Sequence, residues 1–96
     1  MGSSVGIGPQ QAELNAQIDG LATVMSVYGP WMKIAVFAAH ELLAKWPGDY
    51  TIQRRNGTYF KVTLFEPSYE HIGEDANFPQ AVLLAAQGAL LSQSER

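Results

Sequence analysis

Apolar residues repeat with a helical period along the first third of the chain. Between Pro9 and Tyr28 they recur at spacings of three, four and seven, which places on one helical stripe Leu14, Ile18, Leu21, Ala22, Met25 and Tyr28. Pro9 suits a first helical turn, and Gly29-Pro30 stops the pattern because proline cannot continue a helix. We predict a first helix over 9–28.

A second helical pattern runs from Pro30 to Trp46. Its apolar face comprises Trp31, Met32, Ala35, Ala38, Ala39, Leu42, Leu43 and Trp46. Lys33, His40 and Glu41 lie on the opposite side, and Phe37 falls among them. Either a neighbouring element covers Phe37 or it is exposed, and an exposed phenylalanine is a candidate contact residue.

After Pro47-Gly48 the period changes to two, which is typical of strands. Tyr50 and Ile52 alternate with Thr51, Gln53 and Arg55. Asn56-Gly57 predicts a type I′ hairpin turn, since both residues accept a positive φ. In a second strand over 58–65 the set expected to face the helices is Phe60, Val62 and Leu64, alternating with Tyr59, Lys61, Thr63 and Phe65.

The segment from Glu66 to Phe78 is acidic and contains Pro67 and Gly73, so we expect mostly loop, with a short third strand around 68–72 left open. Pro79 favours a helix start, and a last, largely apolar helix is predicted over 79–92. Its small residues Ala85, Ala86, Gly88 and Ala89 suit either a homodimer seam or packing within the chain.

These elements predict a single α+β domain over residues 9–96, with residues 1–8 as a disordered tail. The order is helix, helix, strand, strand, an open third strand, helix. In this fold a small antiparallel hairpin or three-stranded meander packs with three helices. A chain of 96 residues suits one hydrophobic core.

Three runs of the sequence carry a family resemblance: IAVFAAHELLAKW, DYTIQRRNGTYFKVTLFEP and NFPQAVLLAAQGAL. Together they resemble the small α-β-α sandwich domain of bacteriophage and prophage proteins. That family begins with a tryptophan-rich strand, where this chain has a helical pattern from Pro9. The resemblance implies a phage or prophage origin and a fold, and it transfers no catalytic residue.

Composition narrows the functional classes. The net charge is −3, and the six Lys and Arg residues form no long run, which argues against nucleic-acid binding. No cysteine is present, and no apolar run approaches the roughly 18 residues that cross a bilayer. The opening Met1-Gly2-Ser3-Ser4 lacks the pattern of a secretion signal. We expect a protein in the cytoplasm of a bacterial host, with no membrane partner.

The outward strand face is the candidate partner-binding surface, because aromatic and arginine side chains dominate binding hot spots. The candidate contact residues are Phe37, Arg55, Tyr59, Lys61, Phe65 and Tyr69. The alternative is that a helix covers this face and completes a sandwich. A weaker hypothesis uses the Arg54-Arg55-Asn56 turn and Lys61 for nucleic acid, and predicts strongly salt-dependent binding.

No nucleophile elbow or phosphate-binding glycine loop is present, and His40-Glu41 lacks the second histidine of a zinc-protease helix. We therefore expect no catalytic residue and no cofactor. The alternative is a divalent-metal site built from Glu70, His71, Glu74 and Asp75, with His40 as a further ligand. Its competing interpretation is a solvated acidic loop.

The sequence thus favours a non-enzymatic interaction protein of phage or prophage origin. It would bind a host or phage protein, for instance as an inhibitor of a bacterial defence system, or assemble with itself. The alternative is a small metal-binding protein or metal-dependent enzyme that uses His40, His71 and the acidic segment.

Overall fold

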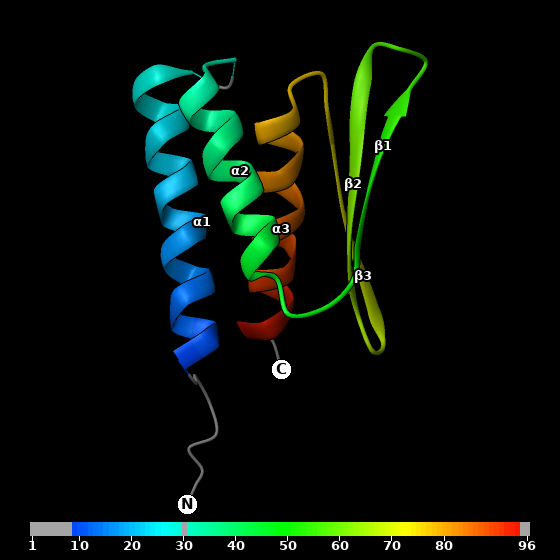
Figure 1. Cartoon of the computed structure of the whole chain (residues 1–96). Helices are drawn as coiled ribbons and strands as arrows, with labels where there is room; N and C mark the ends of the chain where they lie inside the picture. The colour runs from blue at the N-terminus through cyan, green and yellow to red at the C-terminus, as the bar shows by residue number, and fades with distance from the viewer. Residues whose placement is uncertain (1–8, 30, 95–96) are drawn as a thin grey trace, which may run out of the picture.

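The computed structural model describes residues 9–29 and 31–94, so the predicted tail over 1–8 lies outside the described residues. Three helices and a three-stranded antiparallel sheet follow one another in the order α-α-β-β-β-α (Figure 1). The elements are α1 (Pro9–Tyr28), α2 (Lys33–Lys45), β1 (Tyr50–Arg55), β2 (Tyr59–Glu66), β3 (Tyr69–Asp75) and α3 (Phe78–Ser94). The predicted α+β fold is confirmed.

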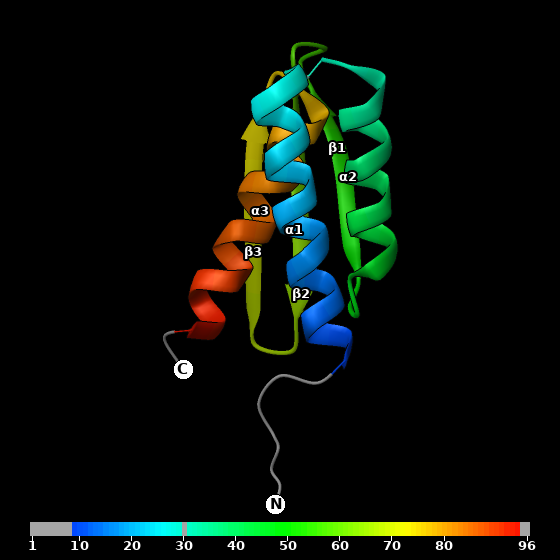
Figure 2. The ribbon, with the colours of Figure 1, turned by 90° about the vertical axis from the view of Figure 1, so that its left-hand side faces the viewer.

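The described helices lie on one face of the sheet (Figures 1 and 2). α3 packs on β2 and β3, while α1 and α2 pack on each other and on α3. No described helix covers the outer face, so the alternative of a helix on that side is wrong for residues 9–29 and 31–94. Helix α1 begins, and α3 ends, at the end of the molecule opposite to the first turns of α2 and α3 (Figure 1).

The core lies among the three helices α1, α2 and α3 and the middle of strand β2. Its largest fully buried side chains include Leu21, Leu42, Leu43, Leu64, Val62 and Val82. Ala81, Ala85 and Ala86 are fully buried and Ala89 is 2% exposed, because α3 turns its small residues toward the chain's own sheet and helices. These alanines therefore pack within the chain, which was one of the two alternatives. They are not exposed at the surface, where a homodimer seam would need them.

The hairpin turn has the predicted backbone conformation and one additional residue. Asn56 and Gly57 have φ values of 56° and 68°, and the Thr58 amide donates to the Arg55 carbonyl at 3.0 Å. The ladder then starts with Arg55 opposite Tyr59, which leaves Thr58 in the connection. Pairing that started at Thr58 would slip by one residue and send facing side chains to opposite sides.

The segment expected to be mostly loop contains strand β3, so the open alternative of a third strand around 68–72 is confirmed, and the strand extends further, to Asp75. Gly73 lies opposite Val62 and His71 opposite Leu64, which places both on the helix face. Glu70, Ile72 and Glu74 alternate with them on the outer face. Glu70 and Glu74 thus occupy the solvent positions of an edge strand, and their polarity hid the alternation.

Two of the predicted core positions of the second helix are also wrong. Trp31 is 72% exposed and Met32 is 41% exposed. Both precede the first helical residue, Lys33, so the helical period does not apply to them. Tyr28, the last residue of α1, is likewise 51% exposed.

Candidate binding groove

The predicted contact residues do not form one surface. By register, four of them share the outer sheet face: Arg55, Tyr59, Lys61 and Phe65. Tyr69 lies opposite Glu66 and so belongs to the helix face, where its ring stacks on His71 with centroids 6.4 Å apart. Phe37 projects from α2 and is 67% exposed, so the alternative that a neighbour covers it is wrong.

The outer sheet face is polar and mixed in charge. Lys61 lies between Gln53 of β1 and Glu74 of β3 across the sheet. Tyr59 and Phe65 are half-buried by their neighbours in this layer. The face therefore mixes the aromatic side chains of Tyr59 and Phe65 and the exposed Ile72 with side chains of both charges.

Strand alternation separates the residues of the candidate metal site. Glu70 and Glu74 point to the outer face, whereas His71 and Asp75 lie on the helix face. His71 is 8% exposed and is 2.6 Å from the Glu66 carboxylate, while the Asp75 carboxylate accepts from the Asn77 amide at 2.9 Å. Among the described residues no three His, Cys, Asp or Glu side chains come together as a metal-ligand group.

A hollow of about 530 Å³ lies on the inner side, between α2 and β1. Its lining is largely apolar and aromatic, and comprises Trp31, Val36, His40, Ile52, Phe60, Ala76, Asn77, Phe78 and Pro79. We call this hollow the α2–β1 groove. His40 does not join His71 here, because its ring packs on Phe78 at a centroid distance of 4.9 Å. Phe60 meets Phe78 edge-on at 5.7 Å.

The groove exists because α2 and β1 are joined at one end and diverge toward the other (Figure 1). At the joined end the Trp46 indole N–H donates to the Asp49 carbonyl at 3.2 Å, and the Phe65 amide donates to the same oxygen at 2.9 Å. Helix α3 packs on the inner face of β2 and β3, and α2 packs on α3. The inner face of β1 is therefore left uncovered. Every residue of β1 is exposed as a result.

Large apolar side chains therefore remain at the groove and beside it. Ile52 is 40% exposed and Tyr50 is 43% exposed, although both lie on the helix face of the sheet. The Trp31 ring lies over Gly29, where a side chain would come within 2.9 Å of it. Contiguous exposed apolar area of this kind marks a binding site more often than scattered surface residues do.

Sequence reasoning missed this groove. It placed Trp31 on the apolar face of the second helix, where it would be buried, and gave Ile52 only its place in the alternation of the first strand. The alternation of Tyr50 and Ile52 gives the correct face of β1. Whether a helix covers that face depends on where α3 packs, which no local pattern in β1 encodes.

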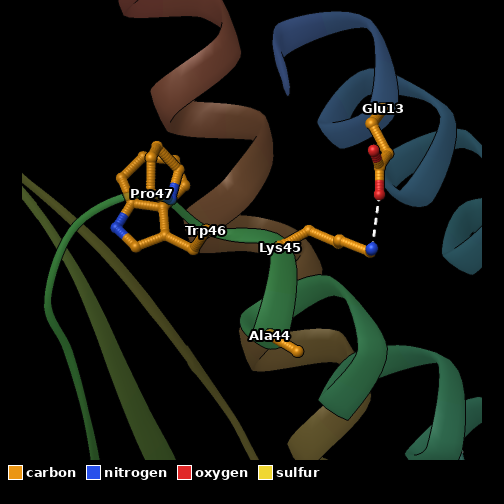
Figure 3. Close-up of a pocket in the computed structure, with 5 residues that line it drawn as sticks. All are labelled: Glu13, Ala44, Lys45, Trp46 and Pro47. Atoms are coloured by element: carbon orange, nitrogen blue, oxygen red, sulfur yellow. Dashed lines mark ion pairs between the residues drawn. The ribbon is translucent and has the colours of Figure 1, made fainter. Parts of the chain in front are cut away.

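A second hollow, of about 310 Å³, lies where α1 begins and α2 ends (Figure 3). In it the Lys45 ammonium reaches across to the Glu13 carboxylate, and the Trp46 and Pro47 rings form the other side. The Lys45 pKa is raised, chiefly by its hydrogen bond to Glu13 and by the charge of that carboxylate. Lys45 and Glu13 form an ion pair, and this pair links α2 to α1 across the hollow.

None of the helices formed by the described residues is long and apolar enough to cross a membrane. Comparison with protein families, curated proteins and solved structures finds no match to this chain.

Proposed function

We propose that this chain is a non-enzymatic protein-binding protein and that the α2–β1 groove receives a segment of its partner. The observation that carries the proposal is the exposed apolar wall of the groove, above all Trp31 and Ile52. Burying such side chains stabilises a complex by about 25 cal/mol per Å² of apolar area, before the entropy cost of association.

The proposed origin is a bacteriophage or prophage, and it rests on the resemblance of three sequence runs to the phage sandwich domain. In that setting the protein would act in the cytoplasm of a bacterial host, by occupying a site on a host or phage protein. Inhibition of a defence protein and a role in virion assembly both fit this mode of action. The metal-binding alternative has no observation in its favour, since strand alternation separates its residues.

The test compares two exposed isoleucines on strands at opposite edges of the sheet. Ile52 lies in the groove, whereas Ile72 lies on the outer face of β3 and is similarly exposed, at 49%. Peptides selected from a displayed random library against the full chain are measured by fluorescence anisotropy against the variants Ile52→Lys and Ile72→Lys. Circular dichroism melts establish that both variants fold.

We expect selected peptides to bind Ile52→Lys about tenfold more weakly or worse, which corresponds to about 1.4 kcal/mol, and to bind Ile72→Lys as they bind the parent chain. Trp31→Ala is expected to weaken binding in the same way. Peptides that bind Ile52→Lys and the parent equally, or a selection that yields no binder, would contradict the proposal.

A further inference from the structure

We propose that the occupant of the α2–β1 groove is an extended, acidic segment of a partner protein, which adds a strand to the open edge of β1. This inference rests on the proposed function and specifies the conformation and the charge of what binds. Three observations carry it: the unpaired edge of β1, the alternation of its side chains and the distribution of charge around the groove.

The first observation is the hydrogen-bonding state of β1. The sheet order is β1-β2-β3, so β1 pairs with β2 on one side only. The Phe65 amide donates to the Asp49 carbonyl, so odd-numbered residues of this strand direct their polar groups toward β2. The N–H and C=O groups of Tyr50, Ile52 and Arg54 therefore point to the open edge, where an added strand can pair with them.

The second observation is the side-chain alternation along β1. Tyr50 and Ile52 face the groove, while Thr51, Gln53 and Arg55 face the outer side of the sheet. An added strand continues both faces, so its inward residues would lie opposite Ile52, beneath Val36 and His40 of α2. These positions suit apolar side chains. The outward residues of the added strand would meet solvent and the polar side chains of β1.

The third observation is charge. The protein carries a net charge of −3, yet the open edge of β1 ends in Arg54 and Arg55. Lys33 lies three residues before Val36 and therefore on the same stripe of α2 that lines the groove. The lining itself includes no carboxylate.

The guanidinium of Arg54 lies 5.8 Å from the centre of the Phe60 ring. The nearest acidic residue by register is Asp75, on the far side of Phe60 from β1, and its carboxylate caps the Asn77 amide. Carboxylates on the added strand would therefore meet two arginines at the end of β1.

The opposite edge of the sheet explains why an acidic strand would select β1. β3 carries Glu70, Glu74 and Asp75, so it repels an acidic segment and attracts a basic one. The two edges of this small sheet thus differ in sign. An acidic partner strand has one attractive edge, and that edge is the one beside the groove.

A second copy of this chain is the competing occupant. Antiparallel pairing of β1 with its counterpart keeps the helices of both copies on the same face of the joined sheet. Figure 2 shows α2 in front of β1, over the edge where the second copy would pair. The two α2 helices would then compete for the same space. A lone extended segment carries no such helix.

The probe is a short peptide of alternating Glu and Val, with a matched peptide of alternating Lys and Val as control, both added to the full chain. We expect the acidic peptide to bind at least about tenfold more tightly at low salt, with the preference shrinking as salt is added. We also expect slower amide exchange at Tyr50, Ile52 and Arg54, and little change at Thr51 and Gln53, which already pair with β2. The charge reversal Arg55→Glu should shift the preference toward the basic peptide.

Equal binding of the two peptides, or unchanged exchange at Tyr50, Ile52 and Arg54, would overturn the acidic strand. So would a dimer mass by light scattering that Ile52→Lys reduces to a monomer, since the groove would then hold a second copy. Library peptides that require Ile52 but are basic or helical would refute this inference and leave the proposed function standing. A library without any binder dependent on Ile52 would remove both.

Discussion

Gly73 of β3 lies directly beneath Ala81 of α3, with no room for a side chain between the two backbones. A Cβ atom at Gly73 would overlap the Ala81 carbonyl oxygen and would lie 2.6 Å from the Ala85 nitrogen. This contact sets how closely α3 approaches the sheet. Helix α3 packs here on β2 and β3, and every residue of β1 is exposed.

Replacing Gly73 with alanine should therefore destabilise the fold. The added methyl group meets backbone atoms, which cannot move aside as a flexible side chain can, and overpacking of this kind costs about 1–3 kcal/mol or more. Urea unfolding monitored by circular dichroism measures the loss. Gly88→Ala is the matched control, because nothing lies within 4 Å of a Cβ there. A Gly73→Ala variant as stable as the parent would show that α3 does not rest on this contact.

Gly20 should respond in the opposite direction. It lies inside α1, is exposed, and has nothing within 4 Å of an added Cβ. Glycine in a helix interior costs about 0.5–1 kcal/mol relative to alanine, so Gly20→Ala should raise the free energy of unfolding by that amount. The same urea titration measures it. A decrease in stability would mean that α1 needs a bend at this position.

Deleting Thr58 should leave the pairing of β1 with β2 unchanged. The deletion would join Arg55 to Tyr59 through Asn56-Gly57 alone, which is the two-residue type I′ connection that matches the twist of a hairpin. Ile52 would remain opposite Val62. Cross-strand nuclear Overhauser contacts between these two residues test the register. A contact between Ile52 and Thr63 instead would show that Thr58 is needed to hold the strands in step.

The ion pair between Glu13 and Lys45 should be visible in an alkaline titration. Its hydrogen bond and charge raise the Lys45 pKa, so Glu13→Gln should bring that pKa back toward its ordinary value. Because the folded-state pKa is the higher one, the pair's contribution is complete below the pKa of the unfolded chain and is lost as pH rises through the folded value. NMR titration of the Lys45 side chain measures the shift. Glu41→Gln, a weaker influence on Lys45, should change it less.

The elements that could be predicted from sequence are those whose local pattern agrees with their burial. Leu14, Ile18 and Leu21 define α1 by their spacing, and Asn56-Gly57 defines the hairpin by its backbone preference. Strand β3 was predicted only as an open and shorter alternative, because Glu70, Glu74 and Asp75 supply the polarity of a loop. The alternation that marks a strand is carried there by Gly73 and His71, which are not typical strand residues.

The groove could not be predicted, because it depends on an absence of contact between elements far apart in the sequence. Ile52 has the same local pattern whether or not a helix covers it. The packing of α3 on β2 and β3 is a tertiary contact that no local pattern in β1 encodes.

The first residue of α1 and the last residue of α3 lie at the same end of the molecule, away from the groove. α1 begins and α3 ends at one end, and the first turns of α2 and α3 lie at the other (Figure 1). The groove is near these first turns, since Trp31, Phe78 and Pro79 line it. A linker attached before Pro9 or after Ser94 would therefore leave the groove unobstructed. Two units on a flexible tether could engage two segments of one target at once, and the gain in apparent affinity would then depend on tether length.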